Sequence, residues 1–170
     1  MSINPITNNN ELSKNTQIKA TLKATKQRRS LKRCRTINLK IQKNKLNKQQ
    51  QEHLFMLFVE AKWVYNHILN DIKNRANDSY VKSLKEIEVP YQDKITIKSL
   101  KFISSQMKQA VATQVKSNLS GLSELKKKGH KVGKLKFKSF VNSINLKQYK
   151  ITHRIDFESN KISIQKIKKN

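Results

Sequence analysis

The longest run of helical periodicity in the chain covers residues 46–72. Apolar side chains recur in it at steps of three and four, which places them on one side of an amphipathic helix. Asn47 suits the N-terminal cap, and Gln50, three residues later, suits the reciprocal position of a capping box. The pattern therefore predicts a long helix with the apolar stripe Leu54, Leu57, Phe58, Ala61, Val64, Tyr65, Ile68, Leu69 and Ile72.

A second helical pattern covers residues 99–128. Lysines 126–128 suit the last turn of a helix, and Gly129 suits the C′ position that ends it. Between the two patterns, Pro90 is expected to end any helix that precedes it. We expect the two helices to pack as a hairpin, with the second contributing the stripe Leu100, Ile103, Met107, Val111, Val115, Leu119, Leu122 and Leu125.

Alternation with a period of two predicts strands on both sides of the helices. Residues 36–42 alternate in this way, and so do residues 133–140, in which lysines separate Leu135 from Phe137. Two further strands are expected in the C-terminal part, joined by a tight turn at residues 158–161. The apolar faces of these two strands are Tyr149, Ile151, Ile155 and Phe157 in one, and Ile162 and Ile164 in the other.

These elements predict an α+β fold. A small antiparallel β-barrel or sheet would contain the first strand and the C-terminal strands, because the first strand has no other partner. We expect a disordered basic N-terminal arm at residues 1–35, a β-barrel from residues 36–45 and 133–170, and an inserted helical lobe at residues 46–132.

The charge of the chain points to a polyanionic partner. The 170 residues carry a formal net charge of +26, with a pI near 10.3. Self-repulsion at this charge destabilises a compact monomer in dilute salt, and a polyanion relieves it. Nucleic acid is the first candidate and an anionic membrane the other. The sequence contains no apolar run near the ~20 residues of a membrane span, so we expect a cytoplasmic protein.

The basic charge lies mainly outside the first helix. No acidic residue occurs between Leu12 and Gln51, whereas seven of the eleven acids lie in residues 52–93. We expect the N-terminal arm to be disordered when free and to bind phosphates through residues such as Arg28, Arg29 and Arg33.

Little in the sequence indicates catalysis or metal binding. The single cysteine, Cys34, excludes an internal disulfide and a zinc site with several thiolates. There is no glycine-rich phosphate loop, and we expect no cofactor, metal or catalytic residue. Of the histidines, His67 is expected to be a surface or partly packed residue. No metal pair at helical spacing is formed by His53, His67, His130 and His153.

Two sets of residues have both a structural and a binding interpretation. Trp63 and Tyr65 could stack on bases, but their positions beside Val64 place at least one of them in the core. The lysines at 101, 108 and 116 recur on the side of the second helix opposite its stripe. Such a row is usually a solvated face, yet it continues into the basic run at 126–138 and could contact phosphates.

Three motifs occur in an order that resembles a known family. They are AKWVYNHIL, which contains residues 62–66; KKKGHKVGKLKFK, residues 126–138; and IDFESNKISIQKI, residues 155–167. The chain resembles the N-terminal half of the TnpB-type proteins of insertion sequences, the OrfB family of transposon-encoded RNA-guided nucleases. The resemblance covers about residues 36–168. It departs from the family pattern where prolines are replaced by Leu46, Leu135 and Gln165.

The resemblance implies a wedge-like barrel and a recognition lobe that hold a guide RNA and read a short DNA motif. Residues 104–111 are similar to a family segment whose motif-reading glutamines fall at Lys108 and Gln109. A lysine at the first of these positions favours phosphate over base contact. The helices are too long for the helix-turn-helix often attributed to the family.

The family continues into an RNase H-like nuclease domain and a zinc ribbon, which we do not expect here. RNA and DNA are the expected partners, and a separately encoded nuclease half is another. Two alternatives stay open: a decayed transposon fragment without activity, and a stand-alone basic RNA-binding protein. The candidate nucleic-acid-binding residues are Arg28, Arg29, Arg33, Tyr65, Asn66, Lys101, Lys108, Gln109, Lys116, Lys126, Lys127, Lys128, Lys134, Lys136 and Lys138.

Overall fold

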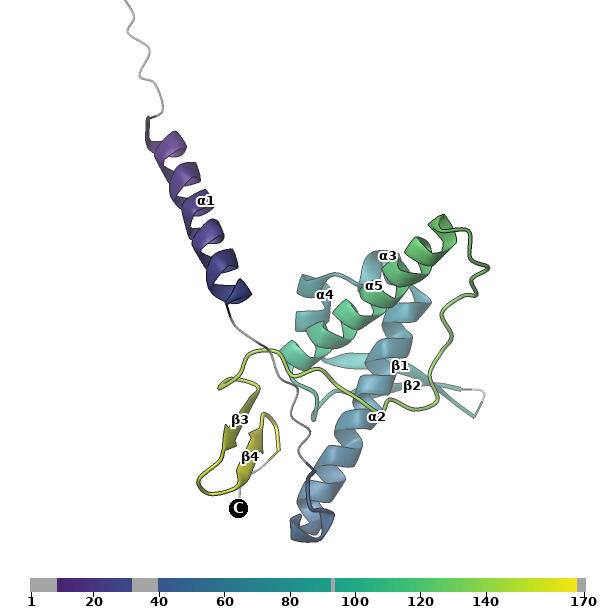
Figure 1. The fold of residues 1–170 in the computed structure, drawn as a ribbon. Helices are drawn as coiled ribbons and strands as arrows, with labels where there is room; N and C mark the ends of the chain where they lie inside the picture. The colour runs from purple at the N-terminus through teal and green to yellow at the C-terminus, as the bar shows by residue number, and fades with distance from the viewer. Residues whose placement is uncertain (1–8, 32–39, 93, 168–170) are drawn as a thin grey trace, which may run out of the picture. The chain divides into compact units, whose positions relative to one another are not determined.

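The computed structural model describes residues 9–31, 40–92 and 94–167, and it divides the chain into two units (Figure 1). The first unit covers residues 1–41 and the second covers residues 42–170. Each unit is described below by itself.

The described residues of the first unit form the helix α1 (Asn9–Ser30), where the sequence predicted a disordered arm. The helix contains no Gly or Pro, and its Lys, Gln, Ala, Leu and Arg residues favour helix formation. Its apolar side chains are not buried: Ile18 is 57% exposed and Leu22 is 64% exposed. Local propensity therefore accounts for α1, without the apolar packing that stabilises the helices of the second unit.

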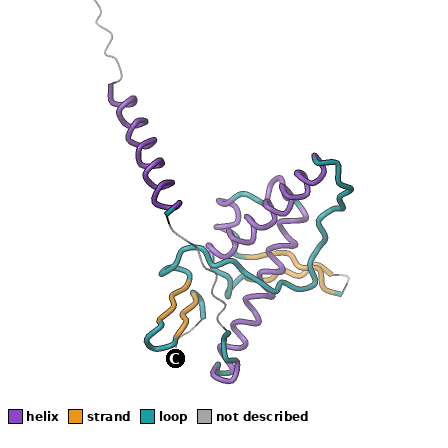
Figure 2. The backbone as a smooth tube through the Cα atoms, in the orientation of Figure 1, coloured by secondary structure: helices purple, strands orange, loops and turns teal. Residues whose placement is uncertain are grey.

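The second unit is mixed α and β (Figures 1 and 2). A short 3-10 turn (Lys43–Lys45) leads into the long helix α2 (Lys48–Asn70), and the short helices α3 (Ile72–Arg75) and α4 (Asp78–Ser83) follow it. A hairpin of β1 (Glu86–Tyr91) and β2 (Lys94–Ser99) precedes the second long helix, α5 (Ser105–Lys127). A long loop then leads to the C-terminal hairpin of β3 (His153–Asp156) and β4 (Lys161–Ile164).

Helix α2 confirms the predicted start and apolar stripe. The Asn47 side chain accepts a hydrogen bond of 2.8 Å from the backbone of Gln50, whose side chain accepts one of 3.2 Å from the backbone of Asn47. This capping box satisfies N–H groups that the first helical turn leaves without partners. The fully buried part of the stripe consists of Leu57, Ala61, Val64, Tyr65 and Ile68.

Helix α5 packs against α2, as the two stripes predict, and also against α4. It begins at Ser105, six positions after the predicted start at 99, because residues up to Ser99 belong to β2. Ser104 caps the helix and accepts a hydrogen bond from the backbone N–H of Met107. The core that the two helices form includes Ile68, Met107, Val111 and Val115.

The β1–β2 hairpin was not predicted. It is antiparallel, with a register from Glu86↔Ser99 to Tyr91↔Lys94. Pro90 is compatible with β1 because both strands of a two-stranded sheet are edge strands, where a missing N–H is tolerated. One face of the hairpin packs on the helices through Ile87, which is 3% exposed.

The C-terminal part agrees with the sequence only in its last hairpin. Strands β3 and β4 pair in the register His153↔Ile164 to Asp156↔Lys161, with the predicted turn between them. The predicted strand at residues 133–140 is wrong, because this segment is extended but pairs with no strand. Of the predicted first strand, residues 36–39 lie outside the described part of the chain, and residues 40–42 are not in a strand.

The expected barrel is therefore not formed among the residues that the structure describes. They contain two separate two-stranded antiparallel sheets, β1–β2 and β3–β4 (Figure 2). Residues 133–141 instead cross back over α2 as a loop, which contributes the buried Val141 and the half-buried Leu135 to the core. The alternation in this loop does not correspond to one buried face, because Leu135 is half-buried whereas Phe137 is 63% exposed.

Candidate nucleic-acid interface

The buried acid Glu60 determines where α5 begins relative to α2. Its side chain is 1% exposed and accepts three hydrogen bonds of 2.8 Å, from the backbone N–H groups of Lys101, Phe102 and Ile103. Three backbone donors compensate a buried carboxylate for its lost hydration. Glu60 therefore belongs to the frame of the fold and does not repel a ligand at the surface.

Lys108 is placed differently from the sequence expectation. It is 6% exposed, and its ammonium donates hydrogen bonds to the carbonyl oxygens of Lys82, at 3.5 Å, and Leu84, at the C-terminal end of α4. Burial lowers the pKa of Lys108, the nearby Glu60 raises it and Lys166 lowers it. The ammonium of Lys108 is already held by carbonyl groups, which disfavours the interpretation of Lys108 as a phosphate contact.

The other residues of the predicted row on the second helix do not form a continuous basic face. Lys101 is exposed in the loop before α5, and Gln109 is half-buried. Lys116 is exposed, but its ammonium lies 3.5 Å from a carboxylate oxygen of Asp78. The buried Ala112 lies in the core between these positions. The row is therefore interrupted by burial and by an ion pair.

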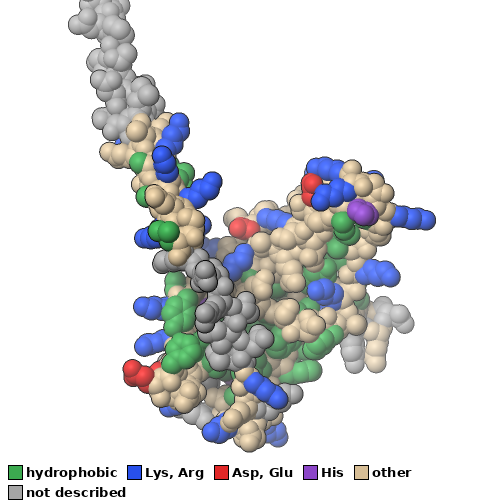
Figure 3. Space-filling view, viewed as in Figure 1, with side chains coloured by type: hydrophobic (Ala, Val, Ile, Leu, Met, Phe, Trp, Pro, Cys, Tyr) green, Lys and Arg blue, Asp and Glu red, His purple; other side chains and the backbone are tan. Residues whose placement is uncertain are grey.

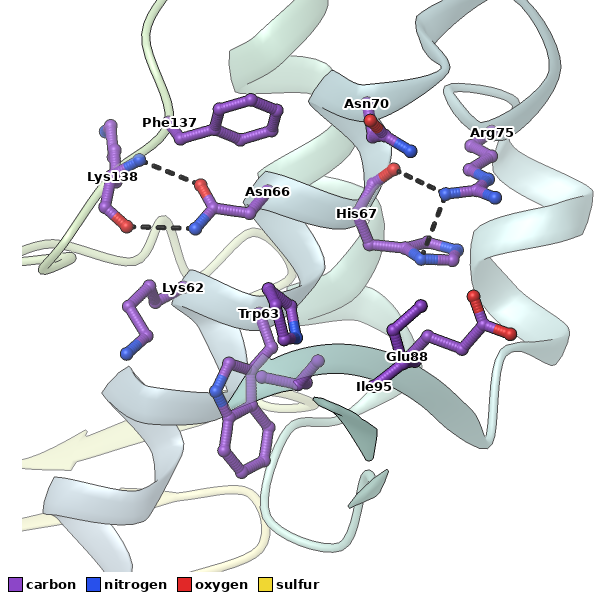
Figure 4. A pocket seen from close by; sticks show the side chains of 12 residues that line it. Lys62, Trp63, Asn66, His67, Asn70, Arg75, Glu88, Ile95, Phe137 and Lys138 are labelled. Carbon is purple, nitrogen blue, oxygen red and sulfur yellow. Dashed lines mark hydrogen bonds between the residues drawn. The ribbon is translucent and has the colours of Figure 1, made fainter. Parts of the chain in front are cut away.

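Tyr65 and Asn66 also have structural roles. Tyr65 is 3% exposed, and the ammonium of Lys138 lies 4.4 Å from the centre of its ring. The Asn66 side chain donates a hydrogen bond of 2.9 Å to the carbonyl of Lys138 and accepts one of 2.8 Å from its N–H (Figure 4). This amide pairs with the loop as a neighbouring strand would. The two residues therefore fix the loop on α2, with Tyr65 buried beneath it and Asn66 half-buried beside it.

A dense group of exposed lysines lies in the basic segment, which we define as residues 126–138. Lys126, Lys127, Lys128, Lys134 and Lys136 are exposed, and Lys138 is half-buried. Figure 3 shows Lys and Arg side chains gathered at the C-terminal end of α5 and along the loop that follows it. Lys127 pairs with Glu124 at 2.9 Å, and the sequence contains no other acid until Asp156. The basic segment therefore carries a continuous positive charge.

A cleft of about 430 Å³ lies where the basic segment crosses α2 (Figure 4). Helix α2 contributes Lys62 and Trp63, the β1–β2 hairpin contributes Glu88 and Ile95, and the loop contributes Phe137. The volume is within the range of ligand-binding clefts in proteins. Sequence analysis singled out only Trp63 of these five for base stacking, because the hairpin that forms one wall was not predicted.

One end of the cleft is a polar cluster around His67. Its Nε2 lies 2.8 Å from the hydroxyl of Tyr80, with which the imidazole stacks, and its Nδ1 lies 3.3 Å from a guanidinium nitrogen of Arg75. Burial lowers the pKa of His67, and Arg75 lowers it further, while Glu88 and Asp71 oppose the shift. The predicted partly packed position of His67 is confirmed.

Arg28 and Arg29 lie in the last turn of α1 and are exposed. They belong to the first unit and are not part of the cleft or the basic segment. Arg33 lies outside the described residues.

Among the described residues, no three His, Cys, Asp or Glu side chains are grouped so that they could hold a metal ion. None of the described helices is both long and apolar enough to cross a bilayer. Among known proteins, no family model, curated protein or solved structure matches this chain.

Proposed function

We propose that the protein binds nucleic acid, with RNA as its first ligand, through the exposed lysines of the basic segment. The observation that carries this proposal is the pairing of Asn66 with the backbone of Lys138. It holds a lysine-rich loop on a folded frame, so that Lys134 and Lys136 extend from a fixed position. Cations held in place lose less conformational entropy when they contact phosphates than cations on a free chain do.

Charge supports the same function. The formal net charge of +26 exceeds what solubility needs, and the stretch between Glu124 and Asp156 contains no acid. In this proposal Lys108, Tyr65 and Asn66 have no direct contact with the ligand. The phosphate contacts come from Lys126, Lys127, Lys128, Lys134 and Lys136.

The resemblance to TnpB-type proteins makes this proposal more specific. We infer a binding module whose partners are a structured RNA and DNA. The three resembling motifs contribute the cleft residues Lys62 and Trp63, the basic segment, and the β3–β4 hairpin. We propose no catalytic activity for the chain.

The test is the salt dependence of RNA binding. In the variant Lys128→Gln/Lys134→Gln/Lys136→Gln, three phosphate contacts are lost, so the slope of log K against log salt should fall by about 2. Affinity for a structured RNA should fall at least about tenfold at physiological salt. A matched variant removes three other exposed lysines: Lys48→Gln/Lys94→Gln/Lys98→Gln.

The two variants carry the same charge change, so they separate a local site from a general charge effect. Binding is expected to be much weaker in the first variant than in the second. Equal losses in both would overturn the basic segment as the site, and so would a wild-type affinity that does not depend on salt. Circular dichroism melting curves check that both variants fold.

A further inference from the structure

The cleft combines features that differ from those of the basic segment beside it. Beside polar residues, its lining includes large apolar and aromatic side chains: Trp63 partly buried on α2, Ile95 73% exposed on β2, and Phe137 63% exposed on the loop. Large apolar side chains exposed around one hollow mark a binding site more often than a bare surface. These three side chains belong to three separate elements, so only the fold brings them together.

The cations of the cleft lie at its edges and not at its centre. In Figure 4, Lys62 and Lys138 lie on one side of the cleft, and Arg75 lies on the other beside Glu88. The carboxylate of Glu88 would repel a phosphate at that end, but it can accept hydrogen bonds from the N–H groups of a base. The charges therefore suit a phosphate at the lysine side and an uncharged, flat group between the apolar walls.

A nucleobase with its phosphate has this combination of properties. We propose that the cleft holds one unstacked base of a single-stranded nucleic acid, with Trp63 as the stacking platform and Phe137 at the opposite side. Asn70, exposed at the cleft and without a hydrogen-bond partner among the described residues, is free to bond the base edge. This inference rests on the proposed nucleic-acid function and adds a preference for single strands over duplexes, because a paired base cannot enter.

The chain contains one tryptophan, so its fluorescence reports on this cleft alone. We expect the emission of Trp63 in the full chain to be quenched when a short single-stranded RNA binds. A duplex RNA and a base-free oligomer of equal length and charge should bind through the lysines without quenching. Quenching of equal size by the base-free oligomer would overturn the proposal, because that oligomer has nothing to stack.

Substitution of the exposed Phe137 tests base stacking in the cleft without changing the core. Phe137→Leu should weaken binding of the single-stranded RNA about fivefold or more, because stacking of one base contributes on that scale. Its affinity for duplex RNA should stay within about twofold. The matched control is Phe140→Leu: Phe140 is 65% exposed on the same loop but does not line the cleft, so its loss should change neither affinity.

The outcomes separate this inference from the proposed function. If Phe137→Leu weakens single-stranded and duplex binding equally, or not at all, the base-stacking cleft is wrong while the basic segment stands. If the triple lysine variant of the preceding section leaves RNA affinity unchanged, the phosphate site is wrong, and base-dependent quenching of Trp63 still decides the cleft. Quenching by no nucleic acid at all would point to a different ligand and overturn the inference.

Discussion

Two sets of lysines in this protein, one on the second long helix and one in the basic segment, have different surroundings in the structure. On the second long helix, Lys108 is buried against carbonyl groups and Lys116 pairs with Asp78. In the basic segment, Lys134 and Lys136 are exposed, and the nearest acids in the sequence are Glu124 and Asp156. A basic residue is therefore a candidate for phosphate binding only when the fold has not already given it a partner.

The largest effect is expected at the buried lysine, Lys108. Lys108→Met keeps the apolar part of the side chain but removes the donor to the carbonyl of Leu84 and one of two donors to that of Lys82, so it should lower the free energy of unfolding by about 1–3 kcal/mol. RNA affinity should not change. Denaturant unfolding and a binding titration of the same variant measure both effects. A large loss of affinity with unchanged stability would place Lys108 at the interface instead.

The second prediction concerns the attachment of the basic segment. Asn66→Ala removes both hydrogen bonds to the backbone of Lys138 and should cost about 1–2 kcal/mol of stability. Trypsin should then cleave after Lys134 and Lys136 faster than in the wild type, since local release exposes the backbone. The control is Asn70→Ala, one turn along the same helix, where the amide is exposed. Equal cleavage rates in both variants would mean that the loop does not depend on Asn66.

The third prediction uses pH to distinguish the polar cluster around His67 from the basic segment. Burial and Arg75 lower the pKa of His67 in the folded state, so the unfolded chain binds the proton more readily. Stability should therefore fall as the pH falls below about 6.5, the ordinary value for histidine. His67→Gln should flatten this dependence in melting curves recorded between about pH 5 and 8. RNA binding of the wild type should not follow this dependence. A pH dependence of RNA affinity that is present in the wild type and absent from His67→Gln would contradict the separation.

The smallest effect is expected at the exposed ion pair. Lys116→Gln removes the contact with Asp78. Because the Lys116 side chain is 49% exposed and the Asp78 side chain is 65% exposed, the loss should change the free energy of unfolding by less than about 0.5 kcal/mol. The measured effect should shrink further in high salt, because salt screens exposed pairs. A loss of stability as large as that of Lys108→Met would show that exposure does not distinguish Lys116 from Lys108.

Much of the helical frame could be predicted from local patterns. The stripe of α2 and its capping box depend on spacings within one helix, which residues such as Asn47, Gln50 and Leu57 reveal directly. The β3–β4 hairpin was also predicted, because its turn and its alternation are adjacent in sequence. The β1–β2 hairpin was missed because Pro90 was interpreted as a helix end, although an edge strand tolerates it.

The candidate site could be predicted only in part. The exposed lysines at 126–128, 134 and 136 follow from composition, and Trp63 was recognised as able to stack. The cleft could not be predicted, since Trp63, Ile95 and Phe137 come from elements that are distant in the sequence. The burial of Tyr65 is a similar case, because an aromatic residue at a helical position suits both the core and a surface.

By itself, the sequence determined the two long helices, the last hairpin and the excess of positive charge, because each depends on residues that are neighbours along the chain. Only the tertiary structure decided which polar groups are used internally. Glu60 binds three backbone donors across 41 to 43 positions, and Asn66 binds Lys138 across 72. No local pattern encodes such a pairing, since it depends on how distant elements pack. That packing leaves the lysines of the basic segment and the walls of the cleft available for a ligand.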